Sequence, residues 1–231
     1  MQNTAGIVSS YEYRQNFDYA LWEELGPSLY VNVPGFAEKL FGVVLDPQPI
    51  AKTVFQKCQT GNGQLFDEKS GWQGWPHDAN ETRVLTWFQT LVKKLLNLAK
   101  EDYELPQPQM RILSKLCKPV PGSVSRQKLD VGFVKTTPRQ AGYDWSQILI
   151  PGELKCNQNE DRHENTWLDL ARYAREIFNA KSTRRFVQGF TLCGPLMRLW
   201  EFDRLGGIAS SAFNINKDGL ELSRQFWVTY G

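Results

Sequence analysis

ILIPGELK, residues 148–155, begins as an apolar strand and then places two charges, Glu153 and Lys155, at alternate positions. Residues i and i+2 of a strand point to the same face, so a carboxylate and an ammonium are predicted to project side by side. Burying charges is costly unless they are paired or bind a metal. The run therefore predicts a functional site or, as the alternative, an exposed strand edge with two solvated charges.

An acidic residue in a second apolar run adds to this pattern, because Asp130 lies within LDVGFV (residues 129–134). Mg²⁺ takes oxygen ligands, usually one or two carboxylates together with waters and phosphate. Asp130 and Glu153 are candidate ligands for Mg²⁺ or Mn²⁺, and Lys155 would orient the attacking water or stabilise charge on a phosphate. One acid on a strand and Glu-x-Lys on the next resembles the layout of restriction-endonuclease-like, or PD-(D/E)XK, nucleases.

The elements predicted around these runs favour the same architecture. In chain order we expect a helix (81–100), three strands (110–118, 129–134, 146–156), a helix (161–178), two strands joined at Gly194-Pro195 (184–194, 196–204) and a short strand (208–215). This order contains αβββαβ, the order of restriction-endonuclease-like cores. The predicted fold class is therefore α/β, with such a core and a helical N-terminal elaboration.

We expect three parts along the chain: a helical and loop-rich N-terminal elaboration (1–80), a nuclease-like core (81–215) and a C-terminal tail (216–231). Residues 36–44, FAEKLFGVV, have helical spacing. Asp78 and Glu81 resemble a capping box at the start of the helix predicted over 81–100. Glu81 therefore has a structural role available, and its functional alternative is a further acidic group near the metal.

The segments DVGFV, IPGELK, LARYAREIF and TRRFVQGFTLCGPLMRLWEFDRLGGIASSAFNI resemble the fungal-type protein kinase family, most strongly over residues 129–215. In that family this segment precedes the kinase lobe and is similar to a PD-(D/E)XK nuclease domain, as in Crinkler-type effectors and fungal spore-killer proteins. The resemblance implies that the functional positions are Asp130, Glu153 and Lys155. The family commonly has Gln where this chain has Asp169.

Kinase motifs are missing from the sequence. It has no V-A-I-K lysine, no H-R-D-x-x-x-x-N loop and no D-F-G. We therefore expect no kinase activity, and a truncated family member or a nuclease-like domain standing alone.

Several other residues are candidates with structural alternatives. Arg184 and Arg185 are predicted to contact a nucleic-acid backbone beside the site, or else to complement a helix C-terminus. Asp169 and Tyr173, on the helix predicted over 161–178, are accessory candidates, and a semi-buried core position is the alternative for Tyr173.

Composition limits the classes of protein but does not select one. The formal net charge is only +2, so nucleic-acid binding would depend on local patches. The 4 cysteines include no C-x-x-C pair, which indicates reduced thiols in the cytoplasm or nucleus, and no signal peptide or membrane span is predicted. The leading prediction is a metal-dependent nuclease whose partner is nucleic acid. The alternative is an inactive effector or interaction module that binds a host protein or DNA.

Overall fold

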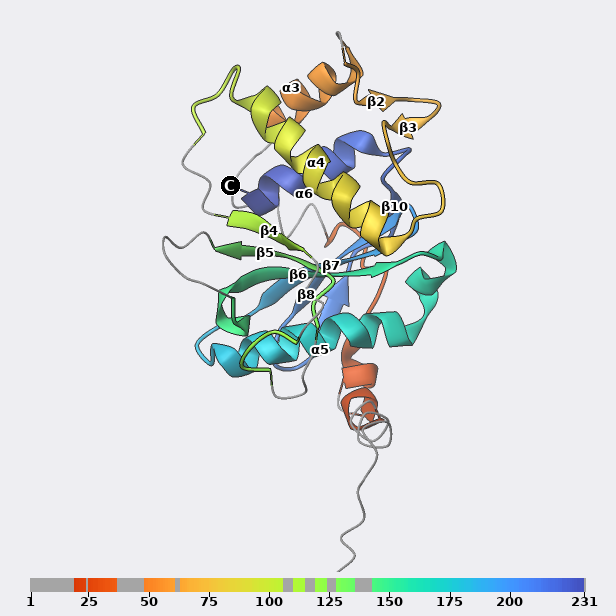
Figure 1. Cartoon of the computed structure of the whole chain (residues 1–231). Helices are drawn as coiled ribbons and strands as arrows, with labels where there is room; N and C mark the ends of the chain where they lie inside the picture. The colour runs from red at the N-terminus through yellow and green to blue at the C-terminus, as the bar shows by residue number, and fades with distance from the viewer. Residues whose placement is uncertain are drawn as a thin grey trace, which may run out of the picture.

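Among the residues that the structure describes, eight strands form a mixed sheet between two layers of helices (Figure 1). The computed structural model describes residues 19–23, 25–36, 48–60, 63–105, 110–114, 119–123, 128–135 and 143–230. The strand order is β1-β9-β8-β7-β6-β5-β4, and β10 pairs with β8. These strands are β1 (Leu29–Tyr30), β4 (Met110–Ser114), β5 (Val131–Lys135), β6 (Ile148–Lys155), β7 (Val187–Cys193), β8 (Leu196–Phe202), β9 (Gly207–Ala209) and β10 (Phe213–Asn214).

Helices cover both faces of the sheet (Figure 1). Helix α5 (Glu164–Ala180) covers one face, and α4 (Glu81–Ala99) and α6 (Gly219–Tyr230) lie over the other, with α3 (Gln48–Gln59) packed against them. Short 3-10 turns are η1 (Gly26–Ser28), η2 (Trp145–Gln147) and η3 (Gln158–Arg162), and β2 (Phe66–Asp67) pairs with β3 (Gly71–Trp72) outside the main sheet.

The hydrophobic core is divided by the sheet into two parts. On β8, Met197 and Leu199 belong to the α4 side, whereas Trp200 and Phe202 belong to the α5 side. Successive residues of a strand point to opposite faces, so a strand covered on both sides needs apolar residues almost throughout. This explains why the central strands were recognisable as continuous apolar runs.

Strand β6 occupies the middle of the sheet and carries the charged residues. It pairs antiparallel with β5 and parallel with β7. Gly152 is the point of closest approach, because a Cβ placed there would lie 2.4 Å from Cζ of Phe190. The absence of a side chain at Gly152 therefore allows the Phe190 ring to pack directly over β6, just before Glu153.

The start of α4 differs from the sequence prediction. Its N-cap is Asn80, whose side chain accepts a hydrogen bond from the backbone N–H of Arg83 at 3.3 Å. The predicted capping box between Asp78 and Glu81 is therefore wrong. Asp78 instead accepts from the Asn80 backbone N–H, and its carboxylate pairs with Arg83 at 3.1 Å. Glu81 is the first helical residue and is left for another role.

The predicted α/β class and the predicted element order are confirmed, because α4, β4, β5, β6, α5 and β7 follow one another along the chain. The hairpin at Gly194-Pro195 is also found, as the antiparallel pair β7–β8. The segment predicted as a single strand over 208–215 instead forms two short strands, β9 and β10. Parts of two predicted elements, residues 37–44 and 115–118, lie outside the described residues.

Two segments at the ends of the chain carry structure that the sequence did not predict. The segment expected as a tail contains α6, in which Leu222, Phe226 and Trp227 are buried against the α4 side of the core. Near the other end, β1 pairs in parallel with β9 at the sheet edge. No helix in the described ranges combines the length and apolar character needed to cross a bilayer.

Candidate functional site

The three residues predicted to form the site meet where β5 begins and β6 ends. Asp130 immediately precedes β5, and Glu153 and Lys155 are on the last part of β6. Val131 pairs with Gly152, so the antiparallel register extended by one residue places Asp130 opposite Glu153. The Oδ2 atom of Asp130 accepts a hydrogen bond from the backbone N–H of Leu154 at 3.2 Å, which ties the two strands together at this point.

Glu153 is a buried carboxylate with incomplete hydrogen bonding. Only 3% of the residue is exposed. Its Oε1 atom lies 2.7 Å from Nζ of Lys155, whereas its Oε2 atom is buried without a hydrogen bond of regular geometry among the described residues. The Asp130 and Tyr173 side chains lie close enough to interact with this carboxyl group. Leaving a buried acceptor unsatisfied costs about 1–3 kcal/mol and more for a charged group, so this oxygen needs an explanation.

Lys155 bridges the strand to helix α5. Its Nζ atom contacts Oε1 of Glu153 and lies 2.9 Å from Oδ2 of Asp169. Asp169 in turn accepts a hydrogen bond from the Arg172 guanidinium, one turn further along α5. The Lys155 side chain remains 27% exposed, so the ammonium can still reach a bound ligand. The accessory candidate Asp169 therefore lies in direct contact with the site.

Two more candidates, Tyr173 and Glu81, lie within electrostatic range of these charges. Burial, followed by the charges of Glu153 and Asp130, raises the pKa of Tyr173 well above its usual value, so the phenol stays protonated. Its ring stacks on Trp145 with centroids 5.9 Å apart. For Glu81, partial burial and the charge of Asp130 raise the pKa, and Lys155 opposes the shift. The structure therefore brings these predicted residues together in one place.

The pKa values of Asp130 and Glu153 are both raised above their usual values. Burial raises the pKa of Asp130, although the Leu154 N–H opposes it. Burial also raises the pKa of Glu153, and the charges of Asp130 and Asp169 add to the effect. Desolvation would lower the pKa of Lys155, but the charges of Glu153 and Asp169 outweigh it and raise the pKa. Such perturbed groups in one place are typical of functional sites.

These residues fit a divalent cation with limited protein ligation. Across the described ranges, no group of three or more His, Cys, Asp or Glu side chains is arranged to hold a metal by itself. Mg²⁺ does not need such a cage, because it often uses one or two carboxylates and keeps several waters. The Oε2 atom of Glu153, opposite Asp130, is a carboxylate oxygen of the type that Mg²⁺ takes as a ligand.

The structure does not bring the two predicted nucleic-acid contacts to this place. Arg184 donates hydrogen bonds from its guanidinium to the carbonyls of Ile148 (2.8 Å) and Leu149, at the other end of β6 from Glu153. At about 3.3 Å per residue, five residues of strand separate these ends by roughly 16 Å. Arg185 is exposed at the same end. Arg184 thus holds the entry to β7 against β6.

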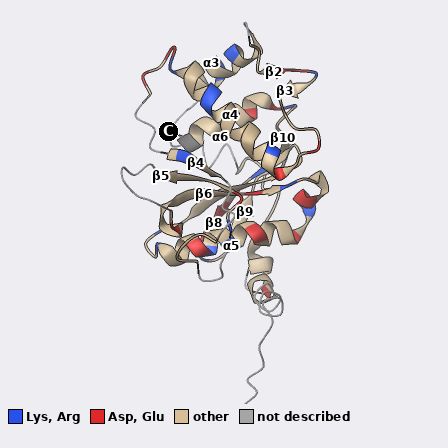
Figure 2. Ribbon diagram, viewed as in Figure 1, with Lys and Arg blue, Asp and Glu red and all other residues tan. Residues whose placement is uncertain are grey.

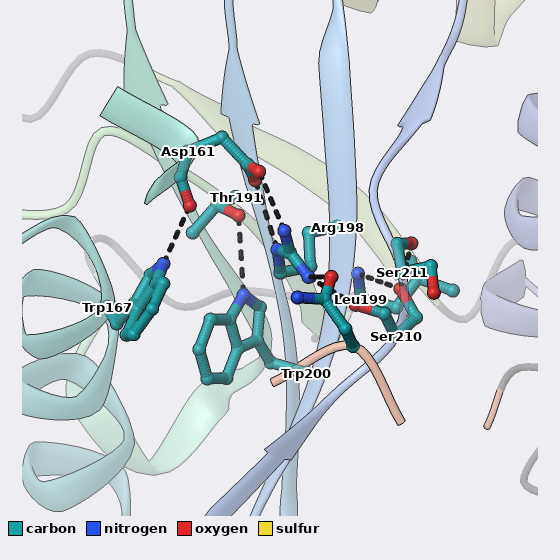
Figure 3. A network of polar contacts seen from close by, with 9 residues as sticks. Asp161, Trp167, Thr191, Arg198, Leu199, Trp200, Ser210 and Ser211 are labelled. Carbon is teal, nitrogen blue, oxygen red and sulfur yellow. Dashed lines mark hydrogen bonds and ion pairs between the residues drawn. The ribbon is translucent and has the colours of Figure 1, made fainter. Parts of the chain in front are cut away.

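A buried network beside the site was not predicted from the sequence (Figure 3). Asp161 and Arg198 are each 3% exposed, and the guanidinium donates to both carboxylate oxygens, at 3.1 and 2.7 Å. Arg198 also donates to Asn32 at 2.8 Å and to the Ser210 carbonyl. Because Asp161 belongs to η3, directly before α5, this pair fixes the start of the helix that carries Asp169 and Tyr173.

The network and the site share one row across the sheet. Glu153 pairs with Thr191, and Thr191 pairs with Arg198, so the three side chains project from the same face of β6, β7 and β8. Trp200 donates to the Thr191 hydroxyl at 3.3 Å, and Trp167 donates to the Asp161 carbonyl at 2.9 Å. A polar residue inside an apolar strand, such as Arg198 in LMRLWEF, was the available signal.

Comparison with known proteins gives one match. Residues 128–229 match the model of a family described as fungal protein kinase, which begins just before Asp130 and extends into α6. The predicted resemblance to that family is thereby supported over this range, and the nuclease relationship stays a prediction. No curated protein and no solved structure gives a significant match to the chain.

Proposed function

We propose that this chain is a Mg²⁺- or Mn²⁺-dependent nuclease with a restriction-endonuclease-like core formed by α4, β4, β5, β6, α5 and β7. The observation that carries the proposal is the buried Glu153, which lies opposite Asp130 and beside Lys155 with one oxygen that lacks a hydrogen bond of regular geometry. A carboxylate in this environment is costly for the metal-free protein and is well suited to bind a cation.

Each residue has a distinct role in this proposal. Asp130 and Glu153 hold the cation, and the Leu154 N–H keeps Asp130 in position. When bound, the metal supplies charge neutralisation and an activated water for phosphodiester hydrolysis. Lys155, still partly exposed, exchanges its contact with Asp169 for the phosphate or the attacking water. Tyr173, with its raised pKa, remains a neutral hydrogen-bond donor beside the carboxylates.

A second candidate function is supported by the contacts of Lys155. Its ammonium is held by two carboxylates, Glu153 and Asp169, where an active site would keep it for substrate. Figure 2 also shows Lys and Arg interspersed with Asp and Glu along the described ribbon. An inactive module that binds a host protein or DNA is compatible with both observations.

Cleavage of supercoiled plasmid and of labelled RNA, with Mg²⁺, Mn²⁺ or EDTA, distinguishes the two candidates. The nuclease proposal expects metal-dependent cleavage that is lost in Lys155→Ala while circular dichroism shows that the variant is still folded. Lys57→Ala is the matched control, because Lys57 also bridges two carboxylates, Glu101 and Asp102. Lys57 is on α3, which carries none of the residues of the candidate site. Cleavage that survives in Lys155→Ala, or that never exceeds the EDTA sample, rejects the nuclease proposal.

A further inference from the structure

A pocket of about 620 Å³ opens next to the candidate site. Its walls come from residues 70–79, from Cys156 to Gln158 after β6, from the β7–β8 turn and from Asn216. Cys156 directly follows Lys155 in the chain, and Ala79 lies two residues before Glu81, so the pocket lies at the end of β6 that carries the candidate site. Its volume is in the range of pockets that hold small molecules or one nucleotide.

The lining of this pocket combines polar and apolar residues, and His77 is among them. Among the described residues that form its walls there is no Lys, Arg, Asp or Glu. The amides Gln73, Asn157, Gln158 and Asn216 offer donors and acceptors, and the partly buried Trp75 offers an indole ring. A phosphate selects cationic side chains, whereas a nucleobase is recognised by amide hydrogen bonds and by stacking on aromatic rings.

Contacts with α4 hold two of the wall residues, Trp75 and Gln73, in place, so the pocket is preformed. Trp75 packs edge-on against Trp87, with ring centroids 4.8 Å apart, and Trp87 donates to the Gln73 carbonyl at 3.2 Å. Gly194, at a φ of 52°, forms part of the floor. A Cβ at Gly194 would lie 3.2 Å from Cβ of Gln158 and would narrow the floor.

We propose that this pocket binds one unpaired nucleobase of the strand that enters the candidate site, which makes single-stranded nucleic acid the preferred substrate class. A base within a duplex is stacked and paired, so it reaches such a pocket only at the cost of leaving the stack. The proposal rests on the proposed nuclease function for the role of the pocket, but binding at the pocket requires no cleavage.

The test is fluorescence anisotropy of labelled DNA and RNA oligonucleotides, single-stranded and as duplexes, in EDTA. We expect the wild type to bind single strands more tightly than duplexes. Trp75→Leu keeps an apolar contact with Trp87 and is expected to weaken single-strand binding about tenfold, the size of one lost base–aromatic stack. Gln158→Ala, at an exposed position, is expected to weaken it about threefold to tenfold. Tyr30→Leu is the control, because this exposed aromatic lies at the β1 edge.

The outcomes separate this proposal from the nuclease proposal. If the pocket variants bind single strands as the wild type does, or if the wild type prefers duplexes or binds neither form, the pocket proposal is overturned even if plasmid cleavage is found. If the pocket variants lose single-strand binding and Tyr30→Leu does not, the pocket proposal stands even if the wild type cleaves nothing. Comparison of the DNA and RNA oligonucleotides shows which type of single strand the pocket binds.

Discussion

Replacing Arg198 with Met is expected to destabilise the fold severely, because Arg198 is one half of a buried ion pair. Met retains an unbranched apolar stem but removes both donors to the Asp161 carboxylate, at 3.1 and 2.7 Å. Asn32 and the Ser210 carbonyl lose their donor as well. Asp161, itself 3% exposed, would be left as an uncompensated charge inside the protein.

The magnitude follows from this burial. Removing one partner of a buried pair typically costs about 3–5 kcal/mol, whereas breaking an exposed pair costs at most about 1 kcal/mol. Arg83→Met is the matched control, because Arg83 and Asp78 pair at 3.1 Å with side chains 70% and 51% exposed. Arg198→Met is therefore expected to be at least three times as destabilising as Arg83→Met.

Urea denaturation at neutral pH measures both variants, and a constant m-value validates the comparison. A double variant, Asp161→Leu with Arg198→Met, is expected to recover part of the loss, since neither charge is then buried alone. If Arg198→Met were no more destabilising than Arg83→Met, the buried network would not have the role described here. The same result would remove the argument that it fixes the start of α5.

Other perturbations test other parts of the structure. Gly152→Ala is expected to lower the free energy of unfolding by about 1–3 kcal/mol, measured in urea, because its Cβ would meet the Phe190 ring at 2.4 Å; a neutral effect would contradict the packing of β6. In EDTA, thermal stability is expected to fall as the pH rises from the usual pKa of a glutamate to the raised pKa of Glu153, because over this range the folded state binds more protons than the unfolded state. Glu153→Gln should reduce this dependence of stability on pH. An unchanged dependence in the variant would refute the assignment of the effect to Glu153. In native protein at pH 8, a thiol reagent followed by peptide mass analysis should label exposed Cys156 but not Cys58, whose pKa burial raises to about 12; labelling of both at similar rates would contradict the burial of Cys58.

The local part of the architecture could be predicted from the sequence. Helical spacing of apolar residues predicted α4 and α5. The alternation of strand residues in ILIPGELK predicted that Glu153 and Lys155 lie on one face, and in the structure their side chains form an ion pair. Such patterns repeat within a few residues, so a single sequence contains them. Asp130 was associated with the pair through the strand order, which the register supports.

What the sequence did not reveal depends on residues far apart in the chain. Strand β1 has only two residues, Leu29 and Tyr30, and exists because β9 offers it an edge. Arg198 and Asp161 are separated by 37 positions, and no local spacing relates them. The pocket needs residues 70–79 beside Gln158 and Asn216. Pairings of this kind arise from tertiary structure, which propensity and periodicity do not encode.

The predicted position of Arg184 and Arg185 beside the site was wrong for a related reason. Arg184 and Arg185 follow a helix and precede a strand, a position that suited a phosphate contact. The structure instead uses Arg184 to satisfy the carbonyls of Ile148 and Leu149 at the far end of β6. A guanidinium has five donors, and whether they serve the backbone or a ligand depends on neighbours that the sequence does not give.

Asp130 and Glu153 are proposed to hold a divalent cation, and Mg²⁺ titration by calorimetry tests this role most directly. The wild type is expected to bind Mg²⁺ and to release protons as it does so, because the pKa values of both carboxyls are raised without metal. Binding should be tighter at pH 8 than at pH 6 and should be lost in folded Glu153→Gln. A wild type that binds no Mg²⁺, or a Glu153→Gln variant that binds it equally well, would contradict the account.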